Sequence, residues 1–417
     1  MGDGGSGRRV VVVGAGVVGM CCARALQRRG FAVTVLDPVP PGESTSSGNA
    51  GILAPEAVAP IAMPGVMRQI PKWLLDPLGP LTIRWWYLPR ILPWLLRLLA
   101  NTRPARIERI AAALHALNRP LIDAHRALLG AGDFARLVRT DGLLYAYESP
   151  RAFAAAATDW AWRKEHGTGA EILSAARLRE LEPALAPGIA GGVFIANGGH
   201  VVDPLALVRA IAARFTAEGG SIRRRRAVGF AFADSRVDAV TTDDGPAAAD
   251  AVVIAAGAWS HLLTVLLGHR VPLEAERGYH LTLAEPGVIP SRPVSLPEGG
   301  FFATPMAMGL RLAGTVEFAG LEAPPDTRRA YAMLARAKRV FPGLADSVTS
   351  EWMGFRPSLP DSLPVIGPSP RLANVFFAFG HGHLGLSEAA ITGRLIAQAV
   401  AGEPPEIDLA PYRIDRF

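Results

Sequence analysis

The 417-residue sequence contains almost no cysteine. Cys21 and Cys22 are its two cysteines, and they are adjacent, which makes a bridge between them difficult. No CxxC motif or Cys/His cluster occurs, so neither a disulfide framework nor a metal site is expected. Independence from disulfides suits a reducing compartment. We therefore expect a cytoplasmic protein, with peripheral contact at the inner membrane as an open alternative.

Lysine and long apolar runs are scarce as well. Lys72, Lys164 and Lys338 are the only lysines among 43 basic residues, and 37 acidic residues leave a net charge of +6. A net positive charge of this size can favour binding to nucleic acid, to an anionic membrane or to an acidic ligand. No nucleic-acid-binding module is visible, so nucleic acid is not an expected partner. No run of about 18 uncharged apolar residues occurs, so no membrane-spanning helix is expected.

Half of the residues are hydrophobic, and the chain is longer than one core usually accommodates, so two domains are expected. Residues 67–106 differ in composition from the rest. They hold four of the eight tryptophans, and the stretch 77–107 has five arginines and no acid. This composition is typical of a segment that rests on an anionic membrane, but also of an outer shell packed on its own domain. Both interpretations remain open.

The chain opens with a βαβ pattern. Residues 9–13 predict a buried strand, 17–29 a helix and 32–36 a second strand that ends at Asp37. The motif GAGVVG at 14–19 joins the first strand to the helix. Its glycines suit a tight turn, a close backbone approach to a pyrophosphate and close helix packing. Because the carboxylate of Asp37 can accept hydrogen bonds from a ribose diol, the pattern predicts dinucleotide binding.

Further elements follow from periodicity and turn residues. Helices are expected at 107–130 and 151–166, with a strand at 142–147 between them. Asp203 and Pro204 predict the start of another helix. A strand pair is expected at 222–232 and 237–242, alternating strands with one helix at 271–350, and a strand at 375–379 before a helix at 387–400.

Seven motifs occur in order along nearly the whole chain: GAGVVG, STSSGNAG at 44–51, VVIAAGAW at 252–259, ERGYHLTL at 276–283, RLAGTVEFAG at 311–320, GFRPSLPD at 354–361 and GHGHLG at 380–385. With these motifs the chain resembles the D-amino-acid oxidase / glycine oxidase superfamily of FAD-dependent oxidoreductases. Within it, the pattern is most similar to the bacterial D-amino acid dehydrogenase (small subunit) branch. This resemblance implies an α/β fold: a discontinuous Rossmann-like FAD-binding domain at 8–66, 197–270 and 352–417, and an antiparallel-sheet substrate domain with flanking helices at 67–196 and 271–351.

The resemblance also implies the cofactor contacts. Relatives that attach flavin covalently use a histidine in the 44–51 segment or a cysteine near the C-terminal motif, and neither is present, so non-covalent FAD is expected. The implied FAD contacts are Gly14, Gly16, Val17, Val18, Gly19, Asp37, Thr45, Ser46, Ser47, Asn49, Ala50, Gly51, Ile52, Val228, Gly257, Trp259, Gly380, His381, Gly382, His383, Leu384 and Gly385.

For catalysis, the resemblance implies that Arg356 clamps the substrate carboxylate, with Tyr279, His280 and His383 as further catalytic candidates. His280 is also compatible with an ordinary strand position. His383 stands where relatives usually carry threonine and Leu386 where they carry tryptophan, so the resemblance does not define the shape of the substrate pocket. Arg311 is compatible with a structural role in support of Glu317 as well as with contact to the ligand.

The implied reaction is oxidative deamination of a D-amino acid, including a D-proline-type secondary amine, by hydride transfer to flavin. The electrons would pass to a quinone or another electron-transfer partner. Several oxidases of the superfamily place a lysine against the flavin, and no lysine falls in the flavin or substrate motifs here. Two alternatives remain open: an oxygen-using glycine or sarcosine-type oxidase, and a flavin-bearing subunit of a larger amine dehydrogenase.

Overall fold

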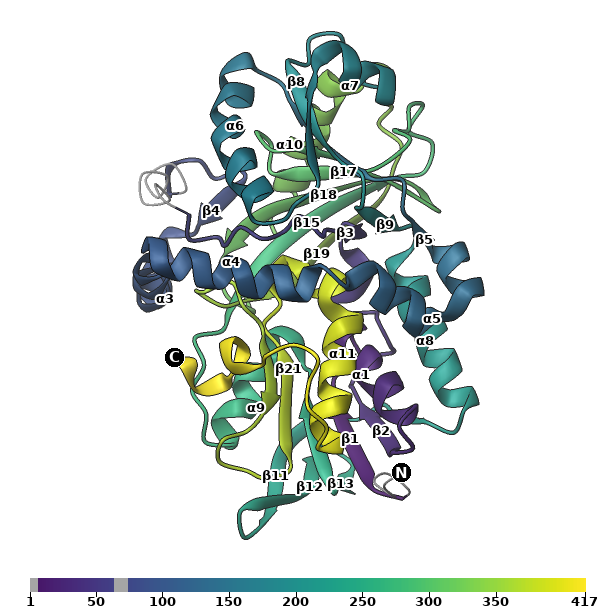
Figure 1. The fold of residues 1–417 in the computed structure, drawn as a ribbon, viewed down its shortest axis with the longest axis vertical. Coiled ribbons are helices and arrows are strands. Elements are labelled where there is room, and N and C mark those ends of the chain that lie inside the picture. The colour runs from purple at the N-terminus through teal and green to yellow at the C-terminus, as the bar shows by residue number, and fades with distance from the viewer. Residues whose placement is uncertain (1–6, 64–73) are drawn as a thin grey trace.

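The computed structural model describes residues 7–63 and 74–417, and two sheets dominate it (Figure 1). The first sheet has six strands in the order β10-β2-β1-β14-β21-β20. Its strands are β1 (Arg9–Val13), β2 (Ala32–Leu36), β10 (Ser221–Arg223), β14 (Ala251–Ile254), β20 (Val365–Pro368) and β21 (Val375–Phe379). The first five of these in sheet order run parallel, and β20 is antiparallel to β21.

Both faces of this sheet are covered, which explains the continuous apolar run of β1. Val10 and Val12 belong to the core shared with α1 (Val17–Gln27), α8 (Pro204–Ala217) and α11 (Gly385–Ala401). Val11 and Val13 belong to the core on the opposite face, together with residues of a three-stranded sheet and of α9 (Ser260–Leu266). The strands of that small sheet are β11 (Ala227–Ala233), β12 (Arg236–Thr242) and β13 (Gly245–Ala248). A parallel sheet buried on both faces is the arrangement that such apolar strands require.

Two long helices from another part of the chain join the α11 side of this core. They are α4 (Pro104–Asn118) and α5 (Leu121–Leu137), which is kinked at Gly130. Leu114, Leu117 and Leu121 are buried in the same core as α1 and α11. The sequence predicted a helix at 107–130 and assigned this stretch to the substrate domain. In the structure the helices pack against the core of the first sheet instead. The α4–α5 pair crosses the molecule between the two sheets in Figure 1.

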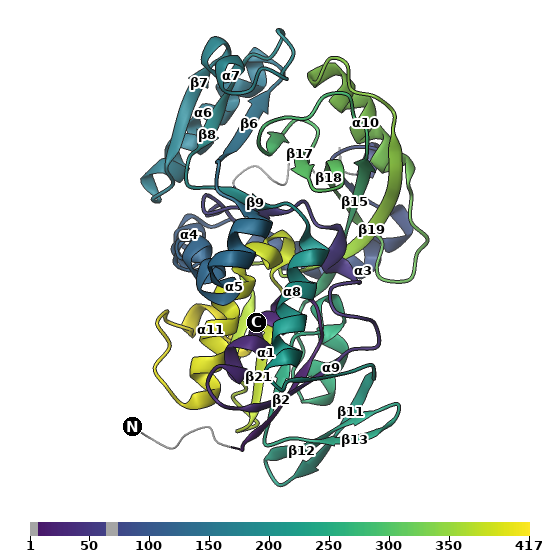
Figure 2. The same ribbon diagram turned by 90° about the vertical axis from the view of Figure 1, so that its right-hand side faces the viewer.

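The second sheet has nine strands and is mainly antiparallel. Its order is β19-β15-β18-β17-β16-β6-β8-β7, and β4 pairs with β18. The strands are β4 (Leu81–Ile83), β6 (Leu143–Tyr147), β7 (Ala170–Ser174), β8 (Gly191–Ile195), β15 (Glu274–Leu283), β16 (Val294–Leu296), β17 (Phe301–Met306), β18 (Gly309–Phe318) and β19 (Val348–Ser358). It carries α6 (Pro150–Glu165), α7 (Ala175–Leu181) and α10 (Arg328–Val340), and Figure 2 shows α6 and α7 on one lobe and α10 on the other. The predicted fold class is thereby confirmed.

Several local predictions can be compared with these elements. Asp203 caps α8, because its Oδ1 accepts a hydrogen bond from the Ala206 amide at 3.0 Å. The single strand predicted at 222–232 is wrong: β10 ends in the parallel sheet and β11 begins in the three-stranded sheet, and residues 224–226 between them belong to neither strand. β19 runs through residue 352, where a domain boundary was predicted. Another predicted boundary, at 66–67, lies outside the described residues, as do Lys72 and Trp73.

The remaining strands are short: β3 (Ile52–Leu53), β5 (Val138–Arg139) and β9 (Gly199–Val201) form a three-stranded sheet between the larger ones. The tryptophan-rich segment contains α3 (Leu88–Ala100), which has Pro93 inside it. Over the stretches 7–63 and 74–417, no helix is long and apolar enough to cross a membrane.

Candidate active site

A large cavity of about 960 Å³ opens where the two sheets meet. On one side it is lined by the carboxyl ends of the parallel strands, at Val13, Leu36, Ala255 and Phe379. On the other side it is lined by β15, β18 and β19. The carboxyl edge of a parallel sheet is where open α/β folds bind ligands.

The glycine motif makes the turn between β1 and α1. Gly14 has φ of 116°, and a Cβ there would lie 2.2 Å from the Ala255 carbonyl oxygen. A Cβ on Gly19 would lie 1.9 Å from the Gly14 carbonyl oxygen, so only glycine lets the helix sit this close. The Val17 amide donates to Ser46 Oγ at 3.0 Å, which brings the 44–51 segment against the helix N-terminus. The N-terminus of α1 therefore faces the cavity.

Asp37 lies at the end of β2, inside the cavity. Its Oδ2 accepts from the Ala15 amide at 2.7 Å and its Oδ1 from the Val39 amide at 2.9 Å. Burial raises the pKa of this carboxyl, whereas the two amides and Arg226 lower it. Arg226 also lines the cavity and was not predicted as a site residue. It is the last residue of the arginine run 223–226, for which the sequence predicts only a solvated strand edge.

Val228 lies just beyond Arg226, at an irregularity of the small sheet. The pairing of β11 with β12 passes from Ala227–Thr242 to Gly229–Thr241, so Val228 is skipped. A skipped residue keeps its backbone N–H and C=O free for other partners. This position therefore offers one donor and one acceptor two residues beyond Arg226.

The 44–51 segment folds as a tight turn that the second sheet supports. The Asn49 side chain donates to the Ser46 carbonyl at 2.7 Å and accepts from the Gly51 amide at 2.7 Å. Arg311 Nη1 donates to the Ser47 and Asn49 carbonyls, both at 3.0 Å. Arg311 thus has structural contacts, but with the 44–51 segment and not with Glu317.

His280 also serves this segment. Its Nδ1 lies 2.8 Å from the Gly48 carbonyl oxygen, and its ring stacks on Trp352 with centroids 5.1 Å apart. Burial, and then Arg311, lower the pKa of His280 to about 3, so the ring is neutral. The structure thus places His280 behind the segment, away from the position expected for a substrate contact.

Arg356 projects from β19 into the cavity. Its Nη1 donates to the Thr315 carbonyl at 2.8 Å and its Nη2 to the Gly314 carbonyl at 3.4 Å. It lies across Gly278 of the neighbouring strand, where a Cβ would be 2.4 Å from Nη2 and 2.5 Å from Cζ. Among the described residues no carboxylate forms an ion pair with it. Two neutral carbonyls therefore hold the guanidinium in a fixed orientation.

Tyr279 borders the cavity, but its hydroxyl points elsewhere. The hydroxyl donates to Glu317 Oε2 at 2.6 Å and accepts from the Asp326 amide at 3.0 Å. Successive residues of a strand face opposite sides, so Tyr279 and Glu276 lie on opposite faces of β15. The expectation that the Tyr279 hydroxyl closes the substrate site is not met by this placement. Glu276, which was not predicted, lines the cavity instead and is the register partner of Arg356.

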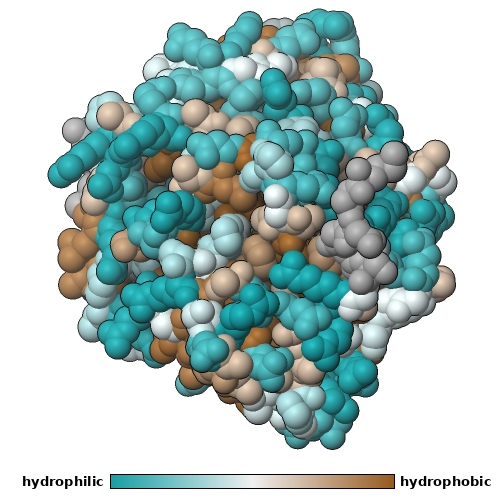
Figure 3. Space-filling model, turned by 60° about the horizontal axis from the view of Figure 1, so that its bottom comes forward, coloured by the Kyte–Doolittle hydropathy of each residue, from teal (hydrophilic) through white to brown (hydrophobic). Residues whose placement is uncertain are grey.

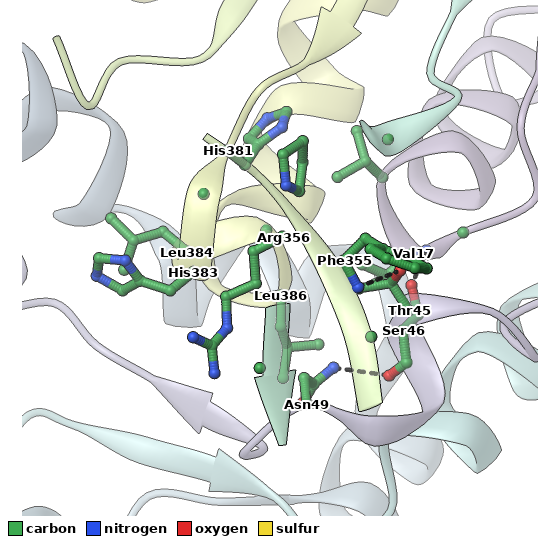
Figure 4. Close-up of a pocket in the computed structure, with 18 of the residues that line it drawn as sticks. Val17, Thr45, Ser46, Asn49, Phe355, Arg356, His381, His383, Leu384 and Leu386 are labelled. Carbon is green, nitrogen blue, oxygen red and sulfur yellow. Dashed lines mark hydrogen bonds between the residues drawn. The ribbon is translucent and has the colours of Figure 1, made fainter. Parts of the chain in front are cut away.

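The two histidines of the GHGHLG motif have different surroundings. His381 Nε2 lies 3.0 Å from Thr392 Oγ1 of α11, and burial lowers its pKa to about 3. His383 opens onto the cavity, on the same side as Arg356 in Figure 4. Burial, and then Arg356 and Arg163, lower the pKa of His383 to about 4. Both rings are therefore neutral at neutral pH. Both residues line the cavity, and the ring of His381 is engaged by Thr392.

Most predicted site residues come together at the cavity. Those that line it are Gly14, Gly16, Val17, Val18, Asp37, Thr45, Ser46, Asn49, Ala50, Gly51, Ile52, Gly257, Trp259, Tyr279, Arg356, His381, Gly382, His383, Leu384 and Gly385. The other predicted residues, all within the described part of the chain, lie behind or beside the wall: Gly19, Ser47, Val228, His280 and Gly380.

These features fit FAD. The hollow over Gly14 and the N-terminus of α1 suit a pyrophosphate. Asp37 suits a ribose diol, and the free backbone at Val228 suits the edge of an adenine. Residues 381–385 line the cavity at the start of α11, whose N-terminus has no side-chain cap. A helix N-terminus stabilises negative charge, as the pyrimidine end of a flavin requires.

Comparison with known proteins agrees with this site. The family model described as FAD dependent oxidoreductase matches residues 9–399. A protein of Bradyrhizobium diazoefficiens named D-amino-acid oxidase is 40% identical over 99% of both chains. A D-amino acid dehydrogenase of Paramagnetospirillum magneticum is 34% identical over 98% of this chain and 99% of its own.

Solved structures show the same fold. Glycine oxidase from Geobacillus kaustophilus superposes with a TM-score of 0.73 at 22% identity, over 98% of this chain and 99% of its own. Iminodiacetate oxidase from a Chelativorans species superposes with a TM-score of 0.74 at 25% identity, over 97% and 98% of the two chains. The chain therefore belongs to the family of FAD-dependent oxidoreductases that act on amino acids.

Proposed function

We propose that this protein oxidises a D-amino acid, including a D-proline-type secondary amine, and passes the electrons to a quinone or another acceptor rather than to oxygen. The observation that carries the proposal is the guanidinium of Arg356. It is fixed in the FAD cavity by two neutral carbonyls and has no ion-pair partner among the described residues. A fixed planar guanidinium of this kind suits bidentate binding of a carboxylate.

The residues of the chain bind and orient the substrate. Arg356 holds the carboxylate, and neutral His383 offers a hydrogen-bonding group on the same side without adding charge. Bound FAD supplies the acceptor for the hydride that leaves the α-carbon. Orientation of this C–H bond is the main contribution expected of the protein. The amine must be neutral when the hydride leaves, and a ring nitrogen meets that requirement as well as a primary amine does.

The proposed acceptor depends on the surroundings of the cavity. Within the described ranges no lysine lines it, and both described lysines are on the surface. The names of the relatives divide: one is an oxidase and several are dehydrogenases. Oxygen as acceptor is therefore the competing candidate, favoured by the name of the 40% identical relative.

The surface near α3 supports a membrane-bound acceptor. Trp85 and Trp86 are 61% and 60% exposed, and Leu92 and Leu96 are exposed on the outer face of α3. Arginines are interspersed along the same stretch, which has no acid. Figure 3 shows hydrophobic residues at its left margin, the side on which α3 lies in Figure 1. Exposed indoles with arginine match an anionic lipid surface, which we propose as the partner of this face.

Anaerobic mixing tests the reaction. Holoenzyme is mixed with a panel of D-, L- and N-methyl amino acids, and loss of flavin absorbance is recorded. We expect D-amino acids to reduce the flavin fastest, and no reduction by any D-amino acid contradicts the proposal. The reduced enzyme is then mixed with aerated buffer or with a short-chain quinone. Faster reoxidation by oxygen would establish the oxidase instead.

Vesicle binding tests the membrane contact. Changing Trp85 and Trp86 to serine should reduce cosedimentation with anionic vesicles at low salt, because two exposed indoles are lost. Phe232→Ser is the matched control, since Phe232 is 51% exposed on the small sheet far from α3 in Figure 1. Equal binding by the tryptophan variant and the control would remove the membrane from the proposal.

A further inference from the structure

Glu276 is a second charged group in the wall of the substrate cavity, besides Arg356. Glu276 lies on β15 directly beside Arg356 of β19, because the two residues are register partners. Its side chain is only 3% exposed, and it lines the cavity. Among the ion pairs of the described residues, none involves Glu276. An acid this well buried needs compensation, and in the structure it comes from the Ser358 hydroxyl and the nearby charge of Arg356.

The neighbours of Glu276 define its charge balance. Arg356 and Ser358 lie beside it on β19, and Glu274 lies two residues away on its own strand. Glu274 is engaged elsewhere, because its Oε1 accepts from the Tyr87 hydroxyl at 2.7 Å. The residue opposite Glu276 on β18 is the apolar Phe318. Glu276 is thus the acid that accompanies Arg356 at the cavity wall.

An amino acid zwitterion carries the complementary pair of charges. With its carboxylate on Arg356, its ammonium group is only two bonds from the held carboxyl carbon, and it needs a nearby acceptor. We propose that Glu276 is that acceptor: it binds the substrate ammonium and takes one proton from it, so that the amine is neutral for oxidation. The inference rests on the function proposed above and assigns a catalytic residue to it.

The proton step is balanced within the site. The N–H bond of the ammonium breaks, an O–H bond forms on Glu276, and the electron pair stays on the nitrogen. Burial raises the pKa of the Glu276 carboxyl, and Glu274 adds to this, while Ser358 and Arg356 lower it. In a buried site, a neutral acid and a neutral amine cost less than two separated charges, so transfer is favoured there.

The test compares Glu276→Gln with the matched control Glu274→Gln in holoenzyme. Anaerobic flavin reduction by a D-amino acid is followed against pH. In wild type and in the control, reduction should extend well below the pKa of the free amine. In Glu276→Gln, only substrate that is already deprotonated should react, so the rate should fall roughly tenfold for each pH unit below that pKa. Activity should return at high pH.

Binding of benzoate, a carboxylate without an amine, separates this role from a structural one. Titration calorimetry should give Glu276→Gln a benzoate Kd within about threefold of wild type. Glu276→Asp, which keeps the acid, should retain the wild-type pH profile at a lower rate. An unchanged pH profile in Glu276→Gln, or equal losses for benzoate and amino acid, would overturn the inference. Failure of wild type to react with any amino acid would instead refute the proposed function.

Discussion

Gly278→Ala tests the position of Arg356 without altering any charge. The new Cβ would lie 2.4 Å from Nη2 and 2.5 Å from Cζ, whereas ordinary contacts are 3.4–4 Å. The guanidinium must therefore shift by about 1 Å. It is the far end of a flexible side chain, so it can move without a shift of the backbone, although its hydrogen bonds to the Thr315 and Gly314 carbonyls are disturbed. The change should fall on ligand binding rather than on stability.

A shift of about 1 Å in a positioning group can cost up to about 100-fold in rate. We therefore expect Gly278→Ala to lower kcat/KM for a D-amino acid by about 10- to 100-fold, which corresponds to about 1.4–2.7 kcal/mol. Benzoate binding should weaken as well, because it uses the same guanidinium. FAD affinity should not change, since Gly278 lies on the substrate side of the cavity.

The assay is anaerobic flavin reduction together with calorimetric titration of benzoate. Gly132→Ala in α5 is the matched control, because a Cβ there meets no atom within 4 Å. Arg356→Lys keeps the charge but loses the fork, and Arg356→Ala should lose about 2–5 kcal/mol of substrate binding while both variants retain FAD. If Gly278→Ala bound benzoate with wild-type affinity, the carboxylate would not bind to the guanidinium in its position across Gly278.

Other predictions concern the cofactor and the buried histidines. Asp37→Ala should weaken FAD by about 1–3 kcal/mol, measured by titrating apoprotein, because one charged hydrogen-bond acceptor is lost; unchanged affinity would remove the ribose role. Acid precipitation should release intact FAD into the supernatant, and flavin that stays in the pellet would contradict non-covalent binding. The pKa values of His280 and His381 are lowered to about 3, below that of an unfolded histidine at about 6.5. The unfolded state then binds more protons, so the Tm should fall as the pH drops from about 6.5 toward 3. A flat Tm across this window would show that these rings are not held neutral.

The cofactor half of the site follows from the sequence because its determinants are local. The motif at 14–19 specifies a strand, a turn and a helix, and Asp37 follows at the end of the next strand. Each role depends on a few neighbouring residues, such as the positive φ of Gly14. The predicted start of α8 at Pro204 succeeded for the same reason, since a cap is formed by adjacent residues.

The substrate half depends on pairing that the sequence does not show. In the motif ERGYHLTL, Tyr279 and His280 were the most prominent candidates. Which side chains of β15 face the cavity depends, however, on how β15 pairs with β19. That register turns Glu276 toward the cavity and sends the Tyr279 hydroxyl to Glu317. His280 shares the face of Glu276, yet the Gly48 carbonyl engages its ring. Only the alternation along β15, combined with the partner strand, could have identified Glu276.

The 44–51 segment connects the two sheets and so links the cofactor half of the site to the substrate half. The 44–51 segment contacts α1 through Ser46, and its carbonyls receive Arg311 and His280 from the second sheet. The Phe355 amide of β19 adds a contact to Thr45 Oγ1 at 3.4 Å, one residue before Arg356. The segment proposed to approach the flavin is thus fixed to the strand that carries Arg356, the proposed carboxylate clamp. Movement of one sheet against the other would break these hydrogen bonds. Under the proposed function, the contacts that join the two halves of the fold therefore also set the position of the substrate relative to FAD.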